Sequence, residues 1–477
     1  MAGSRRRRQL QRQRQRETAA AAHRDLPPKP TPGGQDRPSA TSIVDLPPEL
    51  LAQIQRRLPL ADRLCLNLAL AGCGGAGSSW EEAPCLVFPT GDTAETTTFI
   101  SLARGGVQAA TVRAPDPAMR GHVVLGSSGG WLVTADLRGA LRMANPVTGE
   151  QADLPAISTG TIPFYEASHC SVLLDMNALT LASGSRRDDD GSSWQPALTL
   201  ASWQMRKWFY RKAVLSSSPC PGSYAAMLIL DREFGAAAFA TASDPAWRLA
   251  HCSFGANGIE DAIFHNGRFH TLSYSGTVDA WDRDADTGEF VSTPVGPRLP
   301  LPTGDDVNHP RCRKYIAVSP DGRLVAVLND SREFKVEEER CWSSRTRDDH
   351  QRVPTFEVRV LDAAHGRWVE TRDIGDLALF VGVNASMCVS VREHPGIRAG
   401  CVYYAEDELG KAALRLEGQS PHGTSSYSCP SSMDNDDYEL RDLGVYVLKD
   451  HRVEKVVQGI GRHCCWPLPA WFTPSVV

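Results

Sequence analysis

Short apolar runs separated by glycine-containing turns fill most of the chain from about residue 85 onward. In residues 356–360 apolar and charged side chains alternate, as in a strand with one buried face. Asn266-Gly267 and Asp321-Gly322 each stand between two strand-like runs, and such dipeptides favour the tight turns of β-hairpins. Lys449-Asp450-His451 separates two further runs in the same way. Because helical periodicity is nearly absent from this span, the pattern predicts an all-β region.

A loose internal repeat makes this prediction more specific. Residues 130–149 and 267–288 each contain two strand-like runs followed by a Thr-Gly pair, at Thr148-Gly149 and at Thr287-Gly288. Repeats of about 40–50 residues with several strands each are typical of β-propellers, and the length available would hold roughly six to eight blades. A pair of β-sandwiches would produce similar strands, so the pattern favours a propeller and leaves that alternative open.

Helical periodicity is clear only near the N-terminus, before the β-rich span. Leu51, Ile54 and Leu58 fall at positions i, i+3 and i+7 and form one apolar stripe. Pro47-Pro48 suits the start of a helix, where backbone donors have no partner in any case, and Pro59 ends it. The sequence therefore predicts a helix across residues 48–58.

A second, shorter helix is predicted over residues 62–71, with Gly72 as its C-terminal cap. A glycine cluster follows at 72–77, and its Gly-x-Gly-x-x-Gly spacing comes after a helix and opens no βαβ unit, so we interpret it as a flexible linker. Two short helices cannot bury an apolar stripe by themselves. The stripe must face either the neighbouring domain or a partner protein.

Charge and composition limit the class of protein. Residues 1–40 contain ten Lys and Arg against three Asp and Glu, which predicts a disordered basic tail that could act as a nuclear localisation signal or remain without a role. The remaining chain is acidic and has no basic face with aromatic residues, so nucleic-acid binding is not expected. No apolar run is long enough to span a membrane. Thirteen cysteines without paired spacing indicate reduced thiols in the nucleus, the cytoplasm or both.

The string from Leu46 to Pro59, Leu-Pro-Pro-Glu-Leu-Leu-x-x-Ile-x-x-x-Leu-Pro, resembles the opening of an F-box, the helical module that joins a substrate receptor to a cullin–RING ubiquitin ligase. Further motifs, in the same order along the chain, resemble a large group of plant F-box proteins. These motifs lie at 126–132, 145–149, 154–155, 264–269, 278–282, 376–382, 401–404, 442–446 and 466–475. The resemblance implies a C-terminal kelch-like β-propeller and a substrate-receptor role, and it brings no catalytic residue.

The expected fold is therefore mainly β, with a small N-terminal α-helical F-box followed by a β-propeller. The expected segments are a basic tail (1–40), an F-box-like module (41–72), a linker (73–90) and the propeller (91–477). The partners implied are a Skp-type adaptor and an unknown target protein held by the propeller. The residues expected to bind the adaptor are Leu46, Pro47, Leu50, Leu51, Ile54, Leu58 and Leu60.

The chain departs from the family pattern after residue 68. F-boxes of this type usually finish with a Val-Cys-x-x-Trp-like segment, whereas this chain reads Leu-Ala-Leu-Ala-Gly-Cys-Gly-Gly over 68–75. Two other functions therefore stay open. One is a propeller interaction protein whose degenerate F-box works without a ligase. The other is a propeller enzyme acting at the central channel, which would need a convergent cluster of titratable groups.

Enzyme and metal motifs receive little support from the sequence. Residues 126–130 fit the Gly-x-Ser-x-Gly of a hydrolase, but a strand follows where a helix is required, so we predict a tight turn. His463-Cys464-Cys465 has soft ligand atoms, but no second pair stands at ligand spacing. We therefore expect no catalytic residue, no metal and no cofactor. The Asn-x-Ser sequons at Asn329 and Asn384 carry no meaning for a protein that stays inside the cell.

Overall fold

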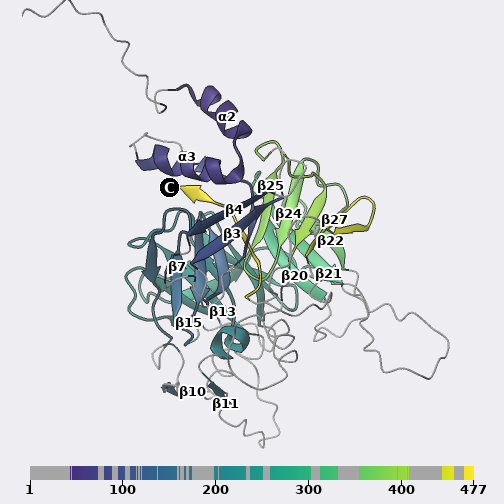
Figure 1. The fold of residues 1–477 in the computed structure, drawn as a ribbon. Helices are drawn as coiled ribbons and strands as arrows, with labels where there is room; N and C mark the ends of the chain where they lie inside the picture. The colour runs from purple at the N-terminus through teal and green to yellow at the C-terminus, as the bar shows by residue number, and fades with distance from the viewer. Residues whose placement is uncertain are drawn as a thin grey trace, which may run out of the picture. The chain divides into compact units, whose positions relative to one another are not determined.

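The computed structural model describes residues 43, 46–72, 80–88, 95–102, 108–113, 115–116, 119, 121–136, 138–157, 161, 166–167, 171–174, 198–201, 204–231, 237–250, 258–301, 312–330, 354–394, 396–405, 407, 443–455 and 467–476. The chain divides into two compact units, residues 1–53 and residues 54–477. The predicted basic tail and the His-Cys-Cys segment at 463–465 lie outside the described residues. Every strand that the structure describes lies in the second unit (Figure 1).

Six sheets of four or five strands form the blades of a β-propeller (Figure 1). Blade 1 contains β2 (Cys85–Phe88), β3 (Thr96–Ser101), β4 (Gln108–Arg113) and β29 (Ala470–Phe472). Blade 2 contains β5 (Val123–Ser128), β6 (Trp131–Ala135), β7 (Leu141–Ala144) and β8 (Gln151–Asp153). Blade 3 contains β12 (Tyr210–Leu215), β13 (Ala225–Leu230), β14 (Ala237–Thr241) and β15 (Arg248–Ala250).

Blade 4 contains β16 (Ile259–His265), β17 (Arg268–Ser273), β18 (Val278–Arg283) and β19 (Phe290–Pro294). Blade 5 contains β20 (Cys312–Val318), β21 (Leu324–Asp330), β22 (Thr355–Asp362) and β23 (Arg367–Thr371). Blade 6 contains β24 (Leu377–Val381), β25 (Ser386–Ser390), β26 (Cys401–Tyr404), β27 (Gly444–Val447) and β28 (Arg452–Lys455). The mainly β prediction and the propeller are confirmed, and the blade number is six, the lower end of the expected range.

Several smaller elements lie outside the blades. Strand β1 (Trp80–Glu81) pairs with β30 (Ser475–Val476), and β9 (Glu166–Ala167), β10 (Ser171–Leu174) and β11 (Leu198–Ala201) form a separate small sheet. A π-helical turn, η3 (Met205–Phe209), leads into blade 3. Among the residues that the structure describes, the α-helices are α2 (Pro48–Arg57) and α3 (Leu60–Gly72). Gly72, the predicted cap, is thus the last residue of α3.

The predicted turns are present at the expected positions. Asn266 and Gly267 join β16 to β17 with φ values of 49° and 78°, and Asn and Gly adopt this left-handed conformation more readily than other residues. The Gly-x-Ser-x-Gly segment is also a tight turn, because β5 ends at Ser128 and β6 begins at Trp131. Local turn chemistry was therefore a reliable guide to the hairpins.

The internal repeat in the sequence corresponds to the same type of turn in blades 2 and 4. In blade 2 the turn joins β7 to β8, and in blade 4 it joins β18 to β19. Asn145 Oδ1 accepts hydrogen bonds from the backbone N–H groups of residues 147 and 148, and Asp284 Oδ1 accepts them from those of residues 286 and 287. In both turns the glycine N–H, from Gly149 or Gly288, donates to the backbone oxygen of the same Asn or Asp. In each turn the Asn or Asp side chain thus accepts the backbone N–H groups that in a strand or helix would donate to a backbone oxygen.

The C-terminal strand closes the ring. β29 pairs with β2, and Leu86 lies opposite Trp471, so the first blade combines residues from both ends of the propeller sequence. This corrects the expected linker at 73–90. Its last part, Cys85–Phe88, is a completely buried strand of blade 1, because a continuous apolar run finds cover on both faces there.

Blade 6 departs from the regular strand order. Its strands follow the order β25-β24-β26-β27-β28. The innermost strand is therefore β25, which is the second strand of this blade along the chain. β24 is antiparallel to β25 but parallel to β26. A parallel pair needs a crossover connection, and the segment between β24 and β26, which contains β25, supplies it.

The hydrophobic core lies between neighbouring blades. Between blades 3 and 4, the ring centroids of Phe239 and Trp281 are 5.1 Å apart, and both side chains are fully buried. Between blades 2 and 3 the backbones approach so closely that a Cβ at Gly126 would lie 2.0 Å from the backbone oxygen of Ala213. Glycine at this position allows the inner strands β5 and β12 to meet.

Candidate functional site

Three parts of the chain are candidates for function: the α2 helix, the α3 helix and the central channel. We begin with α2. Its apolar stripe follows from the helical spacing of residues 51, 54 and 58, and Glu49 in its first turn and Arg56 and Arg57 in its last suit the helix dipole. Leu50 is 46% exposed, Pro47 is exposed, and Leu46, Leu51, Ile54 and Leu58 are partly exposed. Six of the seven residues predicted to bind the adaptor thus keep apolar surface accessible.

The seventh residue, Leu60, is located differently. It begins α3 and is 1% exposed, packed with Leu64 against Val87 and Phe99 of blade 1. The α3 helix therefore uses its apolar face inside the second unit. Leu60 contributes to the core of that unit and not to the accessible surface.

Polar contacts also attach α3 to the propeller. Arg63 Nε lies 2.6 Å from Glu82 Oε2, and the two side chains are 3% and 13% exposed. Arg63 Nη1 also donates to the backbone oxygen of Leu58, at 2.7 Å. Asn67, likewise buried, donates to the backbone oxygen of Arg63 and accepts a hydrogen bond from Gln55 Nε2. These contacts could not be predicted from the sequence, because Arg63 and Asn67 occupy positions that suit a solvent-exposed helix face equally well.

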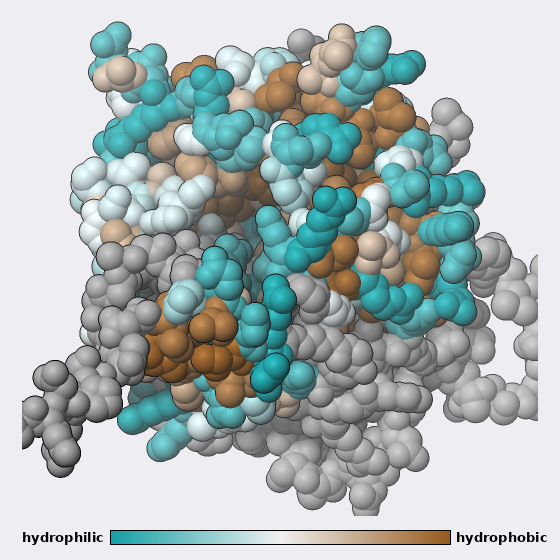
Figure 2. Space-filling view, turned by 90° about the horizontal axis from the view of Figure 1, so that it is seen from above, coloured by the Kyte–Doolittle hydropathy of each residue, from teal (hydrophilic) through white to brown (hydrophobic). Residues whose placement is uncertain are grey.

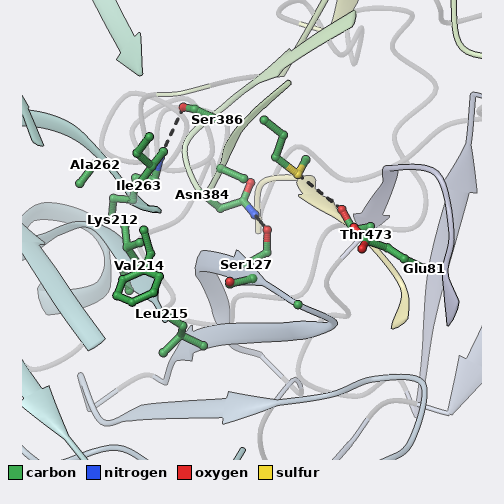
Figure 3. A pocket seen from close by; sticks show the side chains of 16 residues that line it. Glu81, Ser127, Lys212, Val214, Leu215, Ala262, Ile263, Asn384, Ser386 and Thr473 are labelled. Carbon is green, nitrogen blue, oxygen red and sulfur yellow. Dashed lines mark hydrogen bonds between the residues drawn. The ribbon is translucent and has the colours of Figure 1, made fainter. Parts of the chain in front are cut away.

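The central channel contains a cavity of about 220 Å³ whose walls come from the inner strands of several blades (Figure 3). A charged network borders this cavity through Lys212 and Ser386. The ammonium of Lys212 forms an ion pair with Asp261 Oδ1, and the two side chains are 5% and 4% exposed. Asp261 Oδ2 accepts hydrogen bonds from Ser386 Oγ at 2.6 Å and from the backbone N–H of Ile316 at 2.8 Å. One carboxylate thus connects blades 3, 4, 5 and 6.

A second ion pair lies beside the first. Lys314 Nζ of blade 5 lies 2.7 Å from Glu260 Oε2 of blade 4, and Glu260 Oε1 accepts the backbone N–H of Lys314 at 3.1 Å. Burying charges is costly unless each has a partner, and these pairs meet that requirement. In the sequence, Glu260 and Asp261 are adjacent acidic residues within a run of mostly apolar ones. This pattern could have indicated that both carboxylates form buried ion pairs.

Asn384, between β24 and β25 of blade 6, joins this blade to blades 1 and 2. Its Nδ2 donates to the backbone oxygen of Trp471 at 2.6 Å and to Ser127 Oγ at 3.2 Å (Figure 3). Its Oδ1 accepts the backbone N–H of Trp471 at 2.9 Å. Asn384 is 1% exposed, so its sequon is buried in the ring closure between blades 6, 1 and 2.

These arrangements define what the described residues can do chemically. The channel groups are tied to one another and hold the inner strands together. Within the described part of the chain, no group of three or more His, Cys, Asp or Glu side chains is placed to hold a metal ion. Among the same residues, no helix has both the length and the apolarity that crossing a membrane requires. Accessible apolar side chains occur instead in separate areas of the surface, with hydrophilic side chains between them (Figure 2).

The comparison with protein families agrees with this architecture. The family described as KIB1-4 beta-propeller matches residues 99–446. Among curated proteins no significant match is found. Among solved structures, the β-propeller domain of Cps50 (Swd1) from Myceliophteria thermophila is similar, with 12% identity and a TM-score of 0.26, covering 60% of this chain and 88% of that one. The chain carries a β-propeller domain suited to protein–protein interaction, and it belongs to the KIB1-4 beta-propeller family.

Proposed function

We propose that this protein is the substrate-recognition subunit of a Skp–cullin–F-box type ubiquitin ligase. In this proposal α2 docks on the Skp-type adaptor and the propeller binds the target protein. The observation that carries it is the accessible apolar surface of α2, where Leu50 is 46% exposed and the stripe residues Leu51, Ile54 and Leu58 are partly exposed, in the same chain as a β-propeller domain. An isolated short helix with such a stripe gains stability by packing into a groove of a partner.

The chain itself takes part in no bond making or breaking in this proposal. It contributes proximity, because a target held on the propeller presents its lysines to a ubiquitin-conjugating enzyme carried by the same complex. Such a receptor would act in the nucleus, the cytoplasm or both. The adaptor-binding residues in the proposal are Leu46, Pro47, Leu50, Leu51, Ile54 and Leu58.

The experiment is a co-purification of the full chain with a Skp-type adaptor. Leu51→Asp with Ile54→Asp places two carboxylates in the stripe, and we expect binding to weaken by more than about 100-fold, since each buried aliphatic side chain contributes roughly 2 kcal/mol. Gln53→Asp is the control, because Gln53 is an exposed polar residue of the same helix. Full binding by the double variant would contradict the proposed interface.

A second function is favoured by one observation. Because α3 is packed on blade 1 through Leu60 and Leu64, only part of the helical pair is available to an adaptor. The alternative is a propeller interaction protein whose degenerate F-box works without a ligase, by sequestering its partner. Absence of adaptor binding by the wild-type chain, with target binding intact, would decide for this alternative.

A further inference from the structure

A second, larger hollow lies in the second unit, at the junction of blades 5 and 6. Its volume is about 1080 Å³. It is bordered by the β20–β21 turn, by the turn between β22 and β23, by residues 371–377 and by the end of β25. All of these segments belong to one edge of the two blades. Together they form the blade 5–6 cleft.

The floor of the blade 5–6 cleft is apolar and only partly covered. Val360, Ile374, Leu377 and Cys388 line it and are partly exposed, and Val369 is 39% exposed. Burial raises the pKa of the Cys388 thiol to about 12, as expected for an apolar surrounding. The floor therefore offers apolar contact area to a ligand.

The rim carries an excess of negative charge. Five carboxylates line the cleft against two arginines, and these arginines are already paired, Arg323 with Asp321 at 2.6 Å and Arg392 with Asp376 at 2.5 Å. Asp373 and Glu393 have no ion-pair partner within the described part of the chain, and both are exposed. A bound segment with positive side chains would supply the missing partners.

We propose that the blade 5–6 cleft binds an extended basic segment of a partner protein, with apolar side chains on the floor and Lys or Arg at Asp373 and Glu393. Rim carboxylates select a basic partner and speed its association, while the floor supplies most of the affinity. An acidic segment would be repelled by the same rim. This inference depends on the proposed function in one respect: the basic segment would belong to the target protein that the propeller binds.

The experiment is a selection of random 12-residue peptides displayed on phage against the full-length protein. We expect the enriched peptides to carry a net positive charge and at least two large apolar residues. Their affinity should fall as salt concentration rises, because exposed charge pairs are screened. Enriched peptides without a basic excess, or no enrichment at all, would overturn the proposal.

The position of the site is tested with charge-matched variants. Asp373→Asn with Glu393→Gln removes two rim charges and keeps the side-chain shapes. Glu370→Gln with Glu289→Gln removes two exposed charges elsewhere, on β23 and on the β18–β19 turn. The first variant should bind the selected peptides at least tenfold more weakly than the second, and equal affinities would show that the peptides bind outside the cleft.

The outcome is separable from that of the proposed function. Leu51→Asp with Ile54→Asp alters α2 and should leave peptide binding unchanged. If the peptides bind and the adaptor does not, the ligase assignment falls and the cleft stands. If the adaptor binds and no basic peptide is selected, the ligase assignment stands and the cleft is not the recognition site.

Discussion

Arg63 of α3 and Glu82, just before blade 1, form a nearly buried ion pair with an Nε–Oε2 distance of 2.6 Å. Glu82 also accepts the backbone N–H of Ala83 through its other oxygen, Oε1, at 3.2 Å. The pair attaches the second helix of the N-terminal region to the propeller. The docking of α3 therefore depends on a charged contact as well as on the apolar contacts of Leu60 and Leu64.

Glu82→Gln should loosen this attachment. The variant leaves Arg63 buried without its carboxylate, and removing one partner of a buried pair costs about 3 kcal/mol or more. We expect faster hydrogen exchange of the α3 amides together with a lower free energy of unfolding.

The control for Glu82→Gln is Asp153→Asn, which removes the exposed partner of Arg142, a pair with 29% and 70% exposed side chains. Exposed pairs contribute at most about 1 kcal/mol, so this variant should change little. Equal effects of the two variants would show that the Arg63–Glu82 contact does not hold α3.

We expect Asp279 to lower the stability of the protein at neutral pH. Its carboxyl is 3% exposed, Oδ2 has no hydrogen-bond partner among the described residues, and burial raises its pKa from 3.8 to about 6. Because the folded state holds the proton more tightly than the unfolded state, the stability contribution is present below pH 4 and is lost as pH rises to 6. Asp279→Asn should therefore be more stable than wild type at pH 7, by roughly 1–3 kcal/mol.

The measurement is urea unfolding of both proteins at pH 4 and at pH 7. The advantage of Asp279→Asn should shrink toward pH 4, where the carboxyl of the wild type is protonated. Asp282→Asn, at a 47% exposed carboxyl paired with Arg268, is the control and should show no such trend. A constant difference between Asp279→Asn and wild type at both pH values would contradict the assignment.

We expect the opposite pH dependence for His122. Its ring is buried, Nδ1 lies 3.1 Å from Thr134 Oγ1, and burial lowers the pKa of the imidazole from 6.5 to about 4. The unfolded state binds the proton more tightly, so the stability contribution is present above pH 6.5 and is lost as pH falls toward 4. His122→Gln should remove this loss. As pH falls from 7 to 4.5, the free energy of unfolding of His122→Gln should rise relative to that of wild type by roughly 1–3 kcal/mol. The same difference at both pH values would contradict the role of His122.

Gly126→Ala should separate blades 2 and 3. The new Cβ would lie 2.0 Å from the backbone oxygen of Ala213, a contact that only a backbone shift can relieve. We expect a loss of about 3 kcal/mol or more in unfolding experiments, within the range of severe overpacking. Gly222→Ala is the control, because its Cβ would meet no atom within 4 Å, and it should change stability by less than about 0.5 kcal/mol.

Hairpins and the start of α2 could be predicted from sequence because their causes are local. Asn266-Gly267 and Pro47-Pro48 restrict their own backbone angles whatever lies around them. The predicted strand at 356–360 falls within β22 for the same kind of reason, since alternation follows directly from strand geometry. The family motifs added the order of these elements along the chain.

Other features could not be predicted because they depend on partners far apart in the sequence. Trp471 lies opposite Leu86 in the pairing of β29 with β2. Asp261 forms an ion pair with Lys212 and accepts a hydrogen bond from Ser386. Nothing in the neighbourhood of each residue specifies its distant partner. The same holds for Leu60, which is buried because it packs against Val87 and Phe99 of blade 1, residues that are distant in the sequence.

The sequence by itself thus determined the kind of fold, the turns and the apolar stripe of α2, because periodicity and backbone preference act over a few residues. Only the tertiary structure decided the six blades, their closure by β29, the inner position of β25 and the attachment of α3 through Arg63 and Glu82. The physical reason is that blade packing and buried ion pairs are long-range interactions. Their geometry is fixed when the ring closes.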